Sequence, residues 1–319
     1  MTRMARLKFL PAVASLAITI AMGSVSARAG EIALPAQASQ ALDEIYAGNP
    51  DAGIATARAI EQSDPRSPLG YAIEAEALWW KIYCASCEIR WGMVDAWKGG
   101  KNAEDETYLK IADKVVQLAN AQLEIKDTAE MHLYAGMGWA LEARLYGLRD
   151  DRRRTARTGV RARAQFISAL KLDPHLADAE AGLGLYNYYV DTLSPFVKLL
   201  RIFMGIPGGS KEEGIRQLQT GMDRGVLLPV VVARFYLAKN LRTYDHQYAQ
   251  ALSIAEPLVT RFPRNPVFLL LAGNLNAELG RNAEAAKYFR AALSGSDSNP
   301  ACAARVEKIA KEFLAKGAD

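Results

Sequence analysis

Residues 177–213 read ADAEAGLGLYNYYVDTLSPFVKLLRIFMGIPGGSKEE, and the remainder of the chain can be phased from them. The first part, GLGLYNYY, is typical of the packing helix of a helix-turn-helix repeat. The last part, GGSKEE, opens the partner helix, where Ser210 can cap the first turn and Glu213 completes a capping box. Between these helices, residues 193–206 form an apolar hairpin that an ordinary repeat lacks. The segment therefore predicts a helical repeat that carries an insertion.

The spacing of small residues locates the insertion more closely. Gly184, Ala238 and Gly273 occupy equivalent positions in successive repeats and are separated by 54 and 35 residues. A repeat of this kind has a period of about 34 residues, so the first interval carries roughly twenty extra residues. We place the insertion at about 191–209. Two antiparallel helices approach closely only where small residues face each other, so Gly273 is predicted to lie at such a crossing.

The other segments also predict helices. Apolar residues recur at helical spacing, proline and glycine interrupt the segments, and no stretch alternates with period two. Helices are expected near residues 36–46, 51–63, 69–91, 109–123, 128–148, 150–172 and 300–316. The predicted fold class is therefore all-α, a solenoid of antiparallel helix pairs. Residues 30–174 would form an N-terminal region of degenerate repeats and residues 175–319 a C-terminal repeat region, which helix 300–316 caps with its polar back to solvent.

Residues 1–29 have the features of a secretory signal peptide. Basic residues precede an apolar run, and the A-x-A sequence at 27–29 comes directly before Gly30. The run is too short and wrongly flanked for a resident membrane helix. No later run of about 18 uncharged apolar residues follows. We expect cleavage after Ala29 and a mature protein free in the periplasm.

The net charge of +4 belongs to this leader. Four of the 39 Lys and Arg residues lie in it and no acidic residue does, which leaves 35 basic residues against 35 acidic ones. A mature chain without excess positive charge is not expected to bind nucleic acid.

The motifs GLGLYNYY and PGGSKEEG resemble a subfamily of exported bacterial tetratricopeptide-repeat (TPR) proteins, and the repeat pattern is specific from about residue 162 to 293. The resemblance implies a right-handed superhelix whose concave groove holds a peptide or a partner protein, without catalysis or a cofactor. The groove residues of TPR domains that clamp a carboxylate cannot be matched in this sequence. The resemblance therefore supplies no ligand.

Three cysteines invite a redox or metal interpretation. Cys84 and Cys87 form C-A-S-C, and a disulfide between them is the favoured reading in an oxidising compartment. A redox motif would need a preceding strand, but a helix is predicted there; zinc would need further ligands, and the three histidines are scattered. We expect no metal site, and we expect Cys302 to be a buried free thiol.

Two groups of residues are candidates for partner binding. All five tryptophans lie in the first half of the mature chain, where core packing is favoured over an aromatic groove. Arg153, Arg157 and Arg161 recur every four residues and form one stripe, either a solvated face or a surface for an anionic partner. The candidate partner-binding residues are Tyr186, Tyr189, Phe196, Phe203, Arg153, Arg157 and Arg161.

The apolar hairpin leaves three outcomes open. It can pack on the solenoid, which we favour, enter a partner, or lie in a membrane interface with Lys198 and Arg201 towards the headgroups. The sequence thus predicts a non-catalytic scaffold that binds a protein or peptide in the cell envelope. The alternatives are a peripheral membrane or lipid-handling protein and an envelope enzyme with an unrecognised site.

Overall fold

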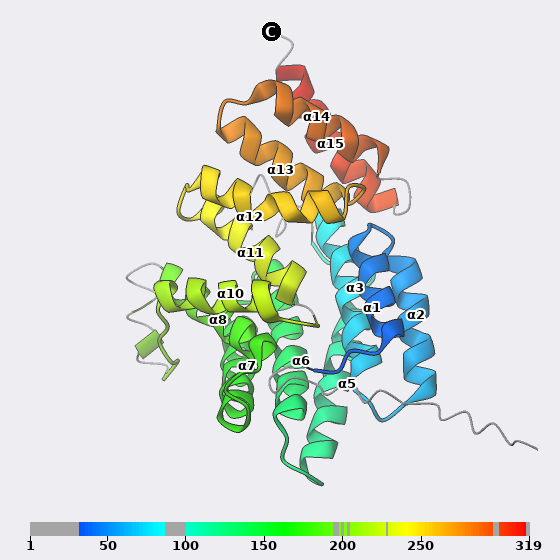
Figure 1. The fold of residues 1–319 in the computed structure, drawn as a ribbon, viewed down its shortest axis with the longest axis vertical. Helices are drawn as coiled ribbons and strands as arrows, with labels where there is room; N and C mark the ends of the chain where they lie inside the picture. The colour runs from blue at the N-terminus through cyan, green and yellow to red at the C-terminus, as the bar shows by residue number, and fades with distance from the viewer. Residues whose placement is uncertain are drawn as a thin grey trace, which may run out of the picture.

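The computed structural model describes residues 32–86, 100–193, 198, 201–202, 205–227, 229–295 and 300–316. Within these residues the chain is all-α, with no strand (Figure 1). The helices are α1 (Ala36–Tyr46), α2 (Pro50–Ser63), α3 (Leu69–Ser86), α5 (Asp105–Leu123), α6 (Ala129–Leu148), α7 (Arg152–Leu172), α8 (Ala177–Thr192), α10 (Lys211–Arg224), α11 (Pro229–Thr243), α12 (Tyr248–Arg261), α13 (Pro266–Glu278), α14 (Asn282–Ser294) and α15 (Pro300–Lys316).

Local sequence signals set where several helices begin. The side chains of Asn49, Thr128, Asp151 and Asn265 each accept a hydrogen bond from a backbone N–H in the first turn of the helix that follows. Ser210 caps α10 in the same way, as predicted. The carboxylate of Glu213 accepts hydrogen bonds from Arg216 at 2.6 and 2.9 Å, so the described contacts hold only the Ser210 half of the predicted capping box.

Consecutive helices pack in pairs, which gives a helical solenoid. The pairs are α1–α2, α3–α5, α6–α7, α8–α10, α11–α12 and α13–α14, followed by α15. Helices α1, α3, α6, α8, α11 and α13 also contact one another in sequence and so line the inner side. The predicted all-α solenoid is therefore the fold of this chain.

Glycines allow α8 and α10 to pack although an insertion separates them in sequence. A Cβ atom at Gly184 would lie 2.9 Å from the carbonyl oxygen of Gly214, and one at Gly214 would lie 2.7 Å from the backbone nitrogen of Tyr188. Backbone atoms cannot move aside as a flexible side chain can. The two glycines therefore fix the crossing point, and the insertion leaves the repeat geometry intact.

Gly273 in α13 lies at the predicted helix crossing, and replacing it with leucine is expected to destabilise the last pair. A Cβ atom there would lie 3.2 Å from both Phe289 Cε2 and Tyr288 Cβ of α14. The larger side chain would overpack this contact, at a cost of about 1–3 kcal/mol. Thermal melts would measure the loss against the control Ala283→Leu on the exposed surface of α14. Equal melting temperatures for the two variants would contradict the assignment of Gly273 to the crossing.

Helix α3 lies at the centre of the molecule rather than on one side of a groove. It contacts α1, α2, α5, α6 and α15, and nearly every residue from Leu69 to Cys84 is buried. The indole of Trp80 packs against the rings of Phe235 in α11 and Phe268 in α13, with centroids 5.0 and 5.3 Å apart. Large side chains therefore fill the interior here, where the resemblance implied a concave groove.

The buried tryptophans belong to this core, as favoured from the sequence. Trp79 and Trp80 are 3% and 4% exposed. Trp139 is half-buried and lies under the guanidinium of Arg161. The distance from the Trp139 ring centroid to Cζ of Arg161 is 4.5 Å. Trp91 and Trp97 lie outside the described residues.

One buried ion pair links α3 to α6. Arg144 Nη1 lies 2.7 Å from Oε2 of Glu76, whose side chain is 0% exposed. Glu76 Oε1 also accepts hydrogen bonds from Trp80 Nε1 at 2.8 Å and from the Tyr46 hydroxyl at 3.3 Å. Burial raises the pKa of the Tyr46 phenol well above its usual value, and the adjacent Glu76 carboxylate raises it further. Glu76 therefore connects three helices through a fully buried charge.

The last helix of the array, α15, packs against α3, and a disulfide joins these two helices. Cys84 of α3 bonds to Cys302 of α15, across 218 residues of sequence. The predicted Cys84–Cys87 pairing and the free Cys302 thiol are both wrong. Cys302 is buried as expected, but solenoid closure places its sulfur against α3, a contact that no local spacing encodes. Cys87 itself lies outside the described residues.

Non-covalent contacts also join the beginning of the array to its end. Asn265 Nδ2 donates a hydrogen bond to the carbonyl oxygen of Tyr46 at 2.9 Å. The ring of Tyr46 also packs against the ring of Phe262, with 5.8 Å between the ring centroids. Arg261 pairs with Asp43 at the surface. Figure 1 shows α1–α3 lying beside α13 and α15 as a result. No helix in the described part of the chain has the length and hydropathy needed to cross a membrane.

Candidate functional site

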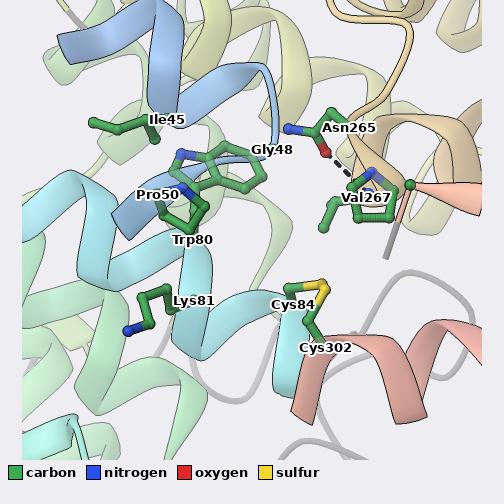
Figure 2. A pocket seen from close by; sticks show the side chains of 11 residues that line it. Ile45, Gly48, Pro50, Trp80, Lys81, Cys84, Asn265, Val267 and Cys302 are labelled. Atoms are coloured by element: carbon green, nitrogen blue, oxygen red, sulfur yellow. Dashed lines mark hydrogen bonds between the residues drawn. A yellow bond between two sulfur atoms is a disulfide. The ribbon is translucent and has the colours of Figure 1, made fainter. Parts of the chain in front are cut away.

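A small cavity lies at the closure between the two ends of the array. It has a volume of about 30 Å³, room for one or two water molecules but not for a ligand. Figure 2 shows the disulfide of Cys84 and Cys302 at one edge and Trp80 and Asn265 at the others. The Lys81 amine is engaged by Asp51 and Glu104, each at 2.9 Å. The cavity is a feature of the seam and does not mark a binding site.

The exposed side chains of α7 form a basic surface, because the helix carries arginines and a lysine but no acidic residue. Arg152 and Arg154 are paired with Asp150 and Asp151 at the start of the helix. Arg153 and Arg157 are exposed, and neither has an acidic partner among the described residues. Arg161, four residues further, is exposed and lies over the Trp139 ring. The predicted stripe is therefore a surface feature with two unpaired positive charges.

Tyr186 of α8 connects α7 to the base of the insertion. Its ring lies 4.0 Å from the Cβ position of Gly159 and 5.6 Å from Cζ of Arg163, both on α7. Its hydroxyl donates to the carbonyl oxygen of Pro207 at 2.8 Å, where the chain returns from the insertion. Burial raises the pKa of this phenol, while the charges of Arg163 and Arg201 act in the opposite direction. Tyr186 thus holds the insertion against α7 instead of facing a groove.

Two arginines at this point have unpaired buried donors. Nε of Arg163 and both Nε and Nη1 of Arg201 are inaccessible to solvent and lack a hydrogen-bond acceptor among the described residues. Leaving such a donor unpaired costs about 1–3 kcal/mol, more for a charged group. The ring face of Tyr186 attracts a guanidinium by about 0.5–2 kcal/mol but does not accept the in-plane N–H bonds. Among the described residues, these donors therefore have no acceptor.

A polar network surrounds the other end of the insertion. Asp191 accepts from Lys198 Nζ at 2.8 Å and from the backbone N–H of Lys211 at 2.9 Å. The hydrogen bond from Lys198 lowers the pKa of the Asp191 carboxyl below its usual value, and the Lys211 N–H lowers it further. Lys211 Nζ in turn pairs with Asp245 at 2.6 Å. Asp191 thus occupies the first backbone N–H of α10, and Ser210 occupies that of Glu213.

Tyr189, the second predicted tyrosine, has a structural contact as well. Its hydroxyl lies 3.1 Å from Oδ1 of Asn240 in α11, to which it donates. The adjacent Tyr188 donates to Asp245 at 2.7 Å. Both bonds tie α8 to the next repeat.

The described part of the insertion is only partly covered. Ile202 is 68% exposed and Leu193 is 37% exposed. Lys198 Nζ instead pairs with Asp191 at 2.8 Å, and Nη1 of Arg201 lies 2.9 Å from the position of a Cβ atom at Gly208. Phe196 and Phe203 lie outside the described residues, so self-packing of the hairpin stays a prediction. Within the described residues, no group of three or more His, Cys, Asp or Glu side chains could hold a metal ion.

The structure thus brings together residues that belonged to separate predictions from the sequence. Tyr186, the basic helix and the insertion meet at one place, whereas Tyr189 belongs to a different contact. Arg163 and Arg201 were not singled out as a pair, because they lie on different elements and their sequence separation carries no periodic signal. The clue in the sequence was that Arg163 is an additional basic residue of α7 outside the stripe.

The chain is similar to known helical-repeat proteins in sequence and in structure. Residues 241–300 match the family model described as a tetratricopeptide repeat. The matched segment contains α12, α13 and α14, where the repeat pattern is best preserved. The chain is also similar to a solved structure, the crystal structure of the P58(IPK) TPR domain. The identity is 13%, the match covers 88% of this chain and 98% of that one, and the TM-score is 0.26.

Proposed function

We propose that this chain is an exported, non-catalytic TPR scaffold that binds a protein or peptide partner in the bacterial cell envelope. The tetratricopeptide match supports the coarser role, since TPR domains bind protein or peptide partners. The observation that carries the finer proposal is the exposed stripe on α7. Arg153 and Arg157 present two exposed charges without acidic partners in the described chain. Such a surface suits an acidic partner.

Charge reversal on this stripe is expected to weaken the partner complex. The double variant Arg153→Glu, Arg157→Glu turns attraction to an acidic surface into repulsion, and about a tenfold weaker complex is expected. Tagged protein purified from its native envelope would be compared for recovered partners. The control Arg290→Glu, Lys308→Glu makes the same change in net charge on exposed residues of α14 and α15. Equal losses in both double variants would mean that net charge, not the stripe, governs recovery.

Export is supported by the leader-like residues 1–29 and agrees with a disulfide, which oxidising compartments favour. Protein recovered from the envelope fraction is expected to begin at Gly30. N-terminal sequencing that finds residues 1–29 retained on the periplasmic protein would overturn the cleavage site.

A peripheral membrane role is the second candidate, and the exposed Ile202 is the observation that favours it. Docking of the insertion into a lipid interface would bury this side chain. Ile202→Asp should then abolish flotation with liposomes at an unchanged melting temperature. The stronger variant Phe196→Asp, Phe203→Asp separates the remaining outcomes: a lower melting temperature supports self-packing, and a normal melt with a lost partner supports burial in that partner.

A further inference from the structure

We propose that Glu61 of α2 and Glu74 of α3 together bind one proton, which makes the packing of these two helices sensitive to pH. Gly70 lets the helices approach closely, because a Cβ atom there would lie 2.6 Å from Cγ of Glu61 and 3.0 Å from the carbonyl oxygen of Ala57. One helical turn after Gly70, Oε1 of Glu74 lies 2.8 Å from Nε and 2.7 Å from Nη2 of Arg58. Arg58 is in turn one residue from Ala57 and one turn before Glu61 on α2. The two carboxyl groups therefore lie on the facing sides of one helix crossing, within hydrogen-bonding reach of each other. This inference goes beyond the proposed scaffold function and does not depend on it.

The surroundings of this carboxyl pair favour one bound proton over two negative charges. Glu74 is 2% exposed, and Oε1 of Glu61 is inaccessible to solvent and receives no hydrogen bond from the described residues. Two carboxylates at this crossing would repel each other, whereas a protonated Glu61 donates its O–H to Glu74 and removes one charge. Burial raises the pKa of the Glu61 carboxyl to about 8, the charge of Glu74 and the hydrogen bond with it act in the same direction, and Arg58 acts in the opposite one. The single guanidinium thus balances Glu74, and the proton balances Glu61.

The helices packed around the carboxyl pair supply no second cation for it among the described residues. The charged groups that act on Glu61 are Glu74 and Arg58. Tyr71 of α3 is close to both acids, since burial raises the pKa of its phenol and the charges of Glu61 and Glu74 raise it further. Polar groups of the neighbouring helices have other partners: Glu44 of α1 accepts from Thr56 of α2, Gln122 of α5 donates to the backbone of Arg66, and Arg144 of α6 pairs with Glu76 of α3.

The stability that the proton confers depends on pH in a defined direction. The pKa of Glu61 is raised from 4.5, its ordinary value, so the folded chain binds one proton more than the unfolded chain between about pH 4.5 and pH 8. The contribution is complete below this range and is lost as the pH rises through about 8. The contact between α2 and α3 is therefore strongest in acid and weakens in alkali. Glu61 is half-buried, which leaves the carboxyl pair in proton exchange with solvent.

The first test follows the Glu61 carboxyl directly. Its carboxyl-carbon NMR signal is titrated with pH in the purified protein and is assigned by its loss in Glu61→Gln. We expect a midpoint at about pH 7–9. Glu74→Gln should lower this midpoint by about one pH unit or more, because it removes the neighbouring charge and leaves Glu61 buried as before. The matched control is Glu142→Gln, which removes another acid whose pKa burial raises to about 7 and should leave the Glu61 midpoint in place.

Thermal melts from pH 5 to pH 9 at constant ionic strength test the effect on helix packing. The Glu61→Gln side chain keeps the size of Glu61 and can donate an amide N–H to Glu74, but it cannot lose a proton. The wild-type melting temperature should therefore fall by at least about 2 °C more than that of Glu61→Gln over this range. The same difference should separate Glu142→Gln from the double variant Glu61→Gln, Glu142→Gln, which excludes titration of Glu142 as the cause. A Glu61 midpoint below about pH 6, a midpoint that Glu74→Gln does not move, or parallel pH profiles for the wild type and Glu61→Gln would each overturn the proposal.

Discussion

Replacing Cys302 with alanine should lower the free energy of unfolding by about 4–5 kcal/mol, the largest effect of a single change that the structure predicts. The bond joins residues 218 apart, and cross-links that close loops of this length restrict the unfolded chain most in the chain-entropy account. The replacement also frees α15 from α3, where Val306, Ile309 and Ala310 are buried. The last helix should therefore lose protection first.

Denaturant titration under oxidising and reducing conditions would measure this effect. Reduced wild-type protein and Cys302→Ala should have similar, lower midpoints, and α15 should be cleaved early in limited proteolysis. Cys87→Ser is the matched control, because it removes a neighbouring thiol and leaves the observed bond in place. A disulfide-linked peptide containing Cys84 and Cys87, or a Cys302→Ala variant as stable as the wild type, would contradict closure by this bond.

Arg144→Met should destabilise the protein by about 3–5 kcal/mol, because it leaves the carboxylate of Glu76 buried without its cation. The loss includes the contacts of the guanidinium with the rings of Trp79 and Tyr236, to which Cζ lies 5.8 and 5.4 Å. The carboxylate would retain only the hydrogen bonds from Trp80 and Tyr46. Urea denaturation of the variant measures the change.

The double variant Glu76→Leu, Arg144→Met tests whether the unpaired carboxylate causes the loss of stability. Replacing both charges with apolar side chains removes the stranded ion but leaves the Trp80 and Tyr46 donors without their acceptor, so the double variant should recover only part of the stability lost in Arg144→Met. Lys110→Met breaks an exposed pair with Glu106 and should have little effect. A double variant that is less stable than Arg144→Met would show that the unpaired carboxylate is not the main cause of the loss.

Local chemistry explains why so much of the solenoid could be predicted. Caps such as Asn49, Thr128 and Ser210 act within one turn, and the breaks at proline and glycine act on adjacent residues. The crossing glycines Gly184 and Gly273 recur with the repeat, so their packing role follows from spacing. The basic stripe of α7 is likewise a property of one helix.

The candidate site could be predicted only in part. Tyr186 and the insertion belong to the same motif, and their proximity in space follows from that. The direction of the Tyr186 hydroxyl, towards Pro207, and the approach of Arg163 to the Tyr186 ring depend on how α7 packs against α8. No periodicity records a contact between side chains on three separate elements.

The sequence alone determined the helices, their antiparallel pairing and the phase of the best-preserved repeat, because each of these depends on residues close together in the chain. Only the tertiary structure decided that the array closes on α3. That closure depends on the sum of small rotations between successive pairs, and it brings Cys302 to Cys84 instead of Cys87 and places Trp80 between Phe235 and Phe268. A small change in each rotation would leave every local pattern intact and open the interior to solvent.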